Sequence, residues 1–220
     1  VANRAYAREL FQAMAPKEMR WCSQCTIQIA QDSELLDLAA ESGCFLLSIG
    51  FETIRQSNLS EINKNWAKAK EYAEMIAAIR ARGIQIVALI MLGLDDDAPE
   101  DFDRTLEFLI RNKVAMAKFH LPLPYPGTRF YDRMEQEGRI LTKDWNEYHY
   151  GNAVIRPLKM TPEAAMDKYW ATYRDFFSMR SIVRRFLPPA PRNLHISMHY
   201  LLANLAFRKL QRAGTHPYLF

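Results

Sequence analysis

The chain has 220 residues, of which 49% are hydrophobic, and its formal net charge is +4. This length and composition predict a globular protein with a substantial core, and no apolar run approaches the roughly 20 residues that would span a bilayer. The N-terminal residues lack the apolar core of a secretory signal. Three cysteines, an odd number, then predict reduced thiols in a cytoplasmic protein.

Charge is distributed unevenly along the chain. Residues 176–220 contain seven Lys and Arg and no Asp or Glu, so they carry +7 and the other residues together carry −3. Such a segment suits an acidic partner or an anionic membrane surface, and a solvated helix face is the simpler alternative. No phosphate-binding glycine loop and no RNA-stacking motif occurs, so we predict no nucleic-acid partner.

The N-terminal third predicts a helix, a strand and a second helix. Apolar residues at helical spacing predict a helix over residues 3–15, and Arg20–Ile27 has the composition of a strand. Asp32–Gly43 predicts a helix with an acidic cap and a terminal glycine. Cys22 and Cys25 form a C-x-x-C pair inside the predicted strand, and without a second pair they predict neither a redox nor a metal site.

The stretch Phe45–Thr53 predicts a strand that is buried on both faces and runs into a lone carboxylate, Glu52. In parallel sheets, ligands gather at the carboxyl ends of the strands. Glu52 is therefore the first candidate for a functional residue. The alternative is an acid that stabilises the first turn of the following helix.

The same alternation continues to residue 123. We expect a helix over Asn65–Arg82, a buried strand over Ile84–Gly93, a helix over Pro99–Arg111 and a strand over Met116–Leu123. Strands that alternate with helices call for a parallel sheet with right-handed crossovers. The sequence thus predicts an α/β fold, a partial (β/α) TIM-like barrel fragment with parallel strands, with a doubly wound sheet as the alternative.

Beyond residue 128 the pattern becomes mainly helical. We expect a short helix over Arg129–Gly138, an aromatic-rich irregular connection over Lys143–Ile155, and a helix that starts at Thr161. A proline-rich break at 188–191 precedes a last amphipathic helix from about Asn193 to Ala213. Residues 1–130 are therefore expected to form the barrel portion and residues 131–220 a helical extension that caps the barrel mouth.

Three further groups of residues are candidate ligand sites. Asp95, Asp96 and Asp97 could hold a hard cation, but adjacent residues rarely converge on one ion, so helix capping is favoured. His120 lies inside a predicted strand and is either a core histidine or an inward-facing ligand. His195 and His199 have a spacing that suits zinc, yet no third ligand lies nearby in the sequence. We predict no metal site and no catalytic residue within this chain.

An ordered set of segments resembles the radical S-adenosylmethionine enzymes, in the cobalamin-binding branch with a helical C-terminal extension. The resemblance runs through nearly the whole chain, and its principal segments are Ser42–Cys44, Ser48–Thr53, Asn63–Lys64, Gly83–Ile84, Ile90–Asp95, Pro124–Thr128, Gly138–Leu141 and Met160–Glu163. The family has a six-stranded partial βα barrel. This chain would supply its second helix through its sixth strand.

The resemblance also implies which residues bind S-adenosylmethionine, because in such enzymes this cofactor lies across the strand ends. Glu52 would contact the ribose or methionine moiety, and Gln24 would face the same cavity. The two segments expected to flank the adenine are Met91, Leu92 and Gly93, and Leu121, Pro122 and Leu123.

The chain departs from the family pattern at its most diagnostic motif. The cluster-binding C-x-x-x-C-x-x-C loop, the strand before Arg20–Ile27 and the cobalamin-binding domain are not in this sequence. S-adenosylmethionine, the [4Fe–4S] cluster and cobalamin are therefore expected in a parent protein, with the cluster and cobalamin sites outside this chain. The fragment alone is expected to be inactive and to need the missing N-terminal segment of the same protein as its partner.

The parent protein is accordingly predicted to be a radical enzyme that transfers a methyl group, or performs related chemistry, at an unactivated carbon. Its substrate is expected to be a small molecule or a lipid, with the basic segment suited to peripheral membrane contact. Two alternatives stay open. One is a non-catalytic α/β binding or interaction module that lacks the iron–sulfur cluster; the other is an ordinary α/β-barrel enzyme that uses Glu52 as acid or base.

Overall fold

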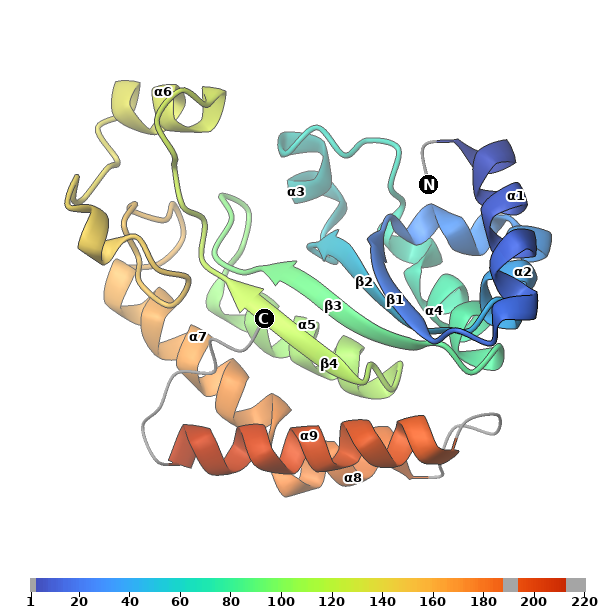
Figure 1. Ribbon diagram of the computed structural model, residues 1–220. Coiled ribbons are helices and arrows are strands. Elements are labelled where there is room, and N and C mark those ends of the chain that lie inside the picture. The colour runs from blue at the N-terminus through green and yellow to red at the C-terminus, as the bar shows by residue number, and fades with distance from the viewer. Residues whose placement is uncertain (1–2, 188–193, 213–220) are drawn as a thin grey trace.

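The computed structural model describes residues 3–187 and 194–212, and its centre is a four-stranded parallel sheet. Its strands lie in chain order (Figure 1), as β1 (Trp21–Cys25), β2 (Cys44–Glu52), β3 (Gln85–Met91) and β4 (Met116–His120). Each strand pairs in parallel with the next one, and the intervening segments contain helices. This arrangement confirms the predicted partial βα-barrel fold.

Helices cover one face of this sheet, and the opposite face is more open. Five helices precede or follow the strands: α1 (Arg4–Met14), α2 (Ser33–Glu41), α3 (Gln56–Glu61), α4 (Tyr72–Ala81) and α5 (Pro99–Arg111). In Figure 1, α4 and α5 lie behind the sheet and α2 lies at the β1 side, against α1. Alternate strand residues such as Ile49, Ala88 and Ile90 are fully buried against this helical layer.

The predicted helix over 65–82 is wrong at its N-terminal end, and α3 was not predicted. Residues 62–68 form turns and extended backbone, followed by a short 3₁₀ turn (Ala69–Glu71) before α4. The side chain of Gln56 holds this segment open, because its Nε2 donates to the carbonyl of Ala67 at 3.0 Å and its Oε1 accepts from the N–H of Ala69 at 3.1 Å. These bonds satisfy backbone groups that a continuous helix would pair internally.

Beyond β4 the described residues contain four α-helices, α6 (Arg129–Gln136), α7 (Pro162–Phe176), α8 (Met179–Phe186) and α9 (Leu194–Arg212). The proline-rich break predicted at 188–191 lies outside the described residues. The helix predicted from Thr161 is α7, which Thr161 caps, and Ser178 then begins α8 by accepting from the N–H of Ser181. Helix α7 packs on β4, where the hydroxyl of Tyr169 donates to the carbonyl of Phe119 at 3.2 Å.

Helix α9 lies at the amino-terminal ends of the strands, away from the end where Glu52 sits (Figure 1). The amide of Asn204 donates to the carbonyl of Ala115 just before β4, and Gln85 at the start of β3 contacts Ser197 at 3.5 Å. The expectation that the basic extension caps the mouth is therefore wrong for α9. The segment after β4, which includes α6 and the aromatic-rich connection, occupies the carboxyl end instead.

The buried core joins both portions of the chain. Phe119 of β4 contacts Tyr173 and Phe176 edge-on, with ring centroids 5.1 and 5.8 Å apart, and Phe177 stacks on Phe207 of α9 at 5.4 Å. The division at residue 130 stays a prediction. None of the helices in the described ranges is long and apolar enough to cross a membrane.

Candidate functional site

The open face of the sheet carries an ordered set of half-buried side chains. Parallel pairing places Ser48 beside Val87, and places Gly50, Leu89 and Lys118 in one row across β2, β3 and β4. Met91 and His120 form the next row. Because side chains alternate between the two faces of a strand, these residues share one face, and the polar ones lie toward the carboxyl ends.

Glu52 ends β2 in an unusual backbone conformation. Its φ is +61°, a left-handed value that costs energy for a residue with a side chain, and the register with β3 shifts between Gly50 and Glu52. The side chain is 23% exposed. A strained residue at a strand end is typical of functional sites, because the surrounding structure must stabilise it.

Lys64 is the partner of this carboxylate. Its Nζ lies 2.6 Å from Oε1 of Glu52 and 3.3 Å from the carbonyl of Gly50, and it sits 5.7 Å from the centre of the Trp66 ring. A Cβ at residue 50 would lie 2.5 Å from Oε1 of Glu52, so glycine leaves room for the carboxylate to fold over the strand. The carboxylate is thus held in one place.

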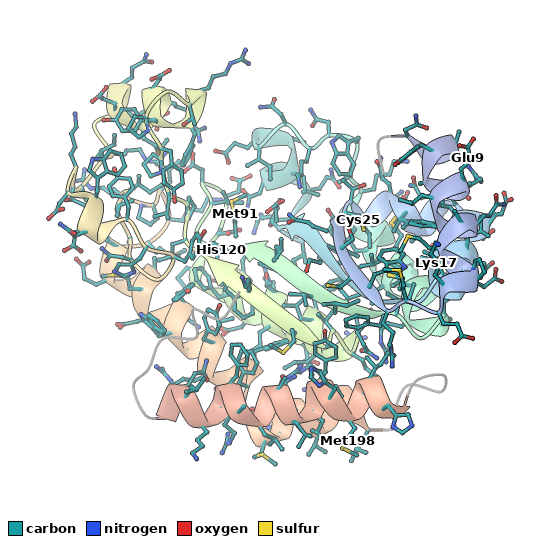
Figure 2. The ribbon with its side chains drawn as sticks, in the orientation of Figure 1. Glu9, Lys17, Cys25, Met91, His120 and Met198 are labelled. Atoms are coloured by element: carbon teal, nitrogen blue, oxygen red, sulfur yellow. The ribbon has the colours of Figure 1, made fainter. Side chains whose placement is uncertain are left out.

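His120 is a polar group of this face with a buried atom that has no partner among the described residues. Its Nδ1 is buried and has no hydrogen-bond partner, while its ring meets the ring of Tyr150 edge-on at 4.3 Å. Burial lowers the pKa of His120, and the charge of Lys118 lowers it further. The imidazole is therefore neutral near pH 7, and it lies beside Met91 at the carboxyl ends of β3 and β4 (Figure 2).

The two segments that are predicted to flank the adenine contain both buried and half-buried residues. Leu92, Gly93, Leu121 and Pro122 are buried, whereas Met91 and Leu123 are half-buried. Gly93 turns the chain after β3 with a φ of +82°, which explains why glycine stands there. Leu92 and Leu121 place their side chains in the core, and their N–H groups donate to the carbonyls of His120 and Tyr150 at 2.8 and 2.9 Å.

Two cavities divide the remaining predicted residues between them. A cavity of about 400 Å³ lies between α3, α6 and the ends of β3 and β4, and it contains Met91, Pro122 and Leu123. Gln24 is exposed on β1 and lines another, of about 570 Å³, beside α1. Gln24 therefore does not share a cavity with the other predicted residues, since β2 lies between them.

The three consecutive aspartates have three separate partners. Asp95 pairs with Arg139 and Arg133, and Asp96 pairs with Lys159. Asp97 accepts from the N–H groups of Gly93 and Leu94 and from the amide of Asn58. The predicted capping of the next helix is wrong, because Ala98 is the N-cap of α5 and the carboxylate of Asp101 accepts its N–H.

The cysteines and histidines do not form a metal site in the described residues, which contain no group of three or more His, Cys, Asp or Glu able to hold an ion. Cys22 is exposed on the edge strand. Burial raises the pKa of Cys25 to about 11 and that of Cys44 to about 12, so both are protonated near pH 7. A cluster needs thiolates, and these residues do not fit one.

Comparison with known proteins places this geometry in context. No protein-family model matches the chain. It is 28% identical over 180 residues to bacteriochlorophyllide d C-12(1)-methyltransferase of Chlorobaculum tepidum, which covers 82% of this chain and 39% of that protein. It is also 28% identical over 130 residues to the hopanoid C-2 methylase of Rhodopseudomonas palustris, covering 59% of this chain and 25% of the relative.

Solved structures give the same fold. The radical S-adenosylmethionine methyltransferase TsrM from Kitasatospora setae, with cobalamin and a [4Fe–4S] cluster bound, aligns with a TM-score of 0.57 at 17% identity, over 95% of this chain and 49% of that one. The chain is thus similar in sequence to methyltransferases and similar in fold to a radical S-adenosylmethionine methyltransferase. It spans about two fifths of the length of the bacteriochlorophyllide methyltransferases.

From the sequence we predicted a functional role for Glu52 but assigned none to Lys64. The structure brings Glu52 and Lys64 to the same end of the sheet as Met91 on the next strand and His120 on the strand after it. The signal for Lys64 was present, since Asn63 and Lys64 belong to the segments that carry the resemblance. No local sequence signal indicates the left-handed turn at Asn63, which has a φ of +59° and returns the chain toward β2.

Proposed function

We propose that the complete protein is a radical S-adenosylmethionine methyltransferase that methylates an unactivated carbon, and that this chain supplies part of its barrel. The observation that carries the proposal is Glu52 at the carboxyl end of a parallel half barrel. Its backbone is strained, and its carboxylate is held by Lys64. Relatives of the chain in sequence and in fold include methyltransferases. Residues 1–130 are the barrel portion in this proposal, and residues 131–220 the helical extension.

The residues present at the strand ends fit S-adenosylmethionine. Glu52 would accept hydroxyl or ammonium groups of the cofactor, and the backbone of Met91–Gly93 and Leu121–Leu123 would flank the adenine. The buried, unpartnered Nδ1 of His120 supports a polar ligand at this end of the sheet. Gln24 belongs to the same site in this proposal only if the cofactor extends across β2.

The cluster and the cobalamin are assigned to other parts of the complete protein, because the cysteines of this chain do not fit a cluster. When bound, the cluster would supply the electron that cleaves S-adenosylmethionine, and the cobalamin would supply the methyl group. The chain itself orients the cofactor at the strand ends and excludes water with the segment that follows β4.

We assign the free edge of β1 to the N-terminal segment of the complete protein. Strand β1 lies at the edge of the sheet, and Cys22, Ser23 and Gln24 are exposed there. Such an edge presents unpaired backbone groups that another strand satisfies. The largely apolar cavity between β1 and α1 lies beside this edge and would be covered by the same segment.

The substrate in this proposal is an apolar small molecule or lipid. Relatives are named for a bacteriochlorophyllide and for a hopanoid. The cavity at the ends of β3 and β4 is lined by apolar groups that suit such a molecule, among them Ile62, Leu94 and Phe130.

Replacing Glu52 tests the site. In the complete protein with its cluster reconstituted, Glu52→Gln should weaken S-adenosylmethionine binding about tenfold or more, because a charged hydrogen-bond acceptor is lost. Equilibrium binding of labelled S-adenosylmethionine measures this. The matched control is Glu74→Gln on the exposed side of α4, which should bind as the wild type does. Equal binding by Glu52→Gln and wild type would exclude Glu52 as a contact.

A specific surface favours membrane contact as well. Helix α8 exposes Met179, Val183 and Leu187 at intervals of four residues, and α9 exposes Met198 and Leu202. Figure 2 shows Met198 on the side of α9 that faces away from the sheet. An apolar stripe on helices without acidic residues is typical of interfacial helices.

Vesicle co-sedimentation tests this surface. We expect the chain to bind anionic vesicles at low salt and to release as the ionic strength rises. Val183→Glu on α8 should reduce the binding, whereas Glu74→Gln should leave it unchanged. If the chain stays in the supernatant with anionic vesicles at low salt, these helices do not anchor the protein.

A further inference from the structure

The cavity between α3 and α6 has a charged rim above an apolar wall. Met91, Leu94 and Pro122 line the side nearest the sheet. Glu61 at the end of α3 and Arg129 and Arg133 on α6 line the side nearest solvent. The cavity measures about 400 Å³, a size that suits a small organic molecule.

Two of the nearby arginines are already neutralised. Arg133 lies 2.5 Å from the carboxylate of Glu61 and 3.3 Å from that of Asp95. Arg139, which is 6% exposed, pairs with Asp95 and with Glu137. Burial raises the pKa of Glu61, and the neighbouring Asp95 raises it further. The guanidinium groups of Arg133 and Arg139 thus already have carboxylate partners within the protein.

Arg129 differs from both. It is exposed at the rim, and it has no ion pair or hydrogen bond with any of the described residues. A guanidinium carries five donors in a fixed plane that matches a carboxylate or phosphate. Beside an apolar wall, this cation is placed to recognise a molecule with an apolar body and one anionic end.

We propose that this cavity binds an apolar organic acid, with Arg129 as the counter-ion of its carboxylate and Met91, Leu123 and Phe130 against its apolar body. The proposal rests on the proposed function, because it assigns the cavity to the substrate of that reaction. It narrows the substrate class from any apolar molecule to one that carries an anionic group. Arg129 is a specificity-determining residue, and no bond to it forms or breaks.

The test uses the chain itself with a fluorescent probe, pyrenebutyric acid, and with the methyl ester of that acid. Fluorescence titration at low salt should show that the wild type binds the acid about tenfold more tightly than the ester, as one charge-assisted bidentate contact predicts. Arg129→Gln should bind the acid only as tightly as the ester, and Arg129→Lys should retain part of the preference. Leu123→Gln should weaken both probes.

Arg180→Gln on α8, also an exposed arginine, is the matched control and should bind both probes as the wild type does. Equal affinity of the wild type for acid and ester would overturn the proposal, as would a preference that survives Arg129→Gln or disappears equally in Arg180→Gln. Failure to bind either probe would overturn it too. Loss of methyl transfer in the complete protein leaves these titrations unaffected, so the two proposals fail separately.

Discussion

At the scale of single residues, Asp97 holds the turn after β3. Its carboxylate accepts from the N–H groups of Gly93 and Leu94 at 2.9 and 3.1 Å and from the amide of Asn58 at 2.6 Å. Burial raises the pKa of Asp97 to about 6, although these bonds act in the opposite direction. The turn that places Met91–Gly93 at the mouth therefore depends on a buried acid that titrates in the weakly acidic range.

This pKa predicts how stability changes with pH. An acid whose pKa is higher in the folded state binds more protons there, so its contribution to the free energy of unfolding falls as pH rises from about 4 to about 6. The size of this contribution is about 3 kcal/mol at most. Urea unfolding between pH 4 and 7 should show that Asp97→Asn, although less stable overall, lacks this decline. A constant difference between wild type and variant across that range would contradict the assigned pKa.

Residue-level inference located Glu52 and missed its partner, for a physical reason. Strand pattern and strand-end position are local properties of Phe45–Thr53, and they sufficed for Glu52. The ion pair with Lys64 depends on a register shift in β2 and a left-handed turn at Asn63, neither of which leaves a periodic signal. The orphaned Nδ1 of His120 likewise follows from packing against Tyr150, a residue of a distant irregular segment.

At the scale of elements, one buried arginine joins α8 to the sheet. Arg185 is 2% exposed and donates to the carbonyls of Val114, Ala115 and Phe176, and to Asn204 of α9. The guanidinium also lies 3.9 Å from the centre of the Phe176 ring. Burial lowers the pKa of Arg185 to about 9, yet its bonds to neutral acceptors hold it inside the protein.

Shortening this side chain should separate those elements. Arg185→Lys keeps the charge but offers three donors in place of five, so buried carbonyls lose partners and the free energy of unfolding should fall by about 2 to 4 kcal/mol. Thermal or urea unfolding measures it. Arg184→Lys, on the exposed neighbour that pairs with Glu107, should leave the stability nearly unchanged because exposed ion pairs contribute little. Similar losses of unfolding free energy in the two variants would show that the buried contacts of Arg185 do not determine its contribution to stability.

The elements themselves were predictable where local signals were complete. The bounds of α5, Pro99–Arg111, were predicted from a proline at its first position and from acids in its first turn, and the structure has the same bounds. The helix predicted from Asn65 failed because Gln56 takes the hydrogen bonds of Ala67 and Ala69. The side chain of Gln56, eleven residues before Ala67, sets that boundary. The periodicity of apolar residues does not indicate such a contact.

At the scale of the whole molecule, the two ends of the half barrel have different roles. The carboxyl ends of the strands carry Glu52, His120 and the charged cavity, whereas α9 packs against the amino ends. The sequence predicted the parallel strands and the helical extension, but not which end each helix covers. That placement is set by long-range contacts such as the one between Phe177 and Phe207, which the order of elements does not encode.

We propose that this fold belongs to an enzyme that transfers a methyl group from S-adenosylmethionine. The direct measurement uses the complete protein, reconstituted without oxygen with its cluster and cobalamin, and given deuterated-methyl S-adenosylmethionine, a reductant and an extract of apolar small molecules. Mass spectrometry should detect S-adenosylhomocysteine and a product carrying the deuterated methyl group, both reduced about tenfold or more in Glu52→Gln. A fully reconstituted protein that forms neither compound would contradict the account.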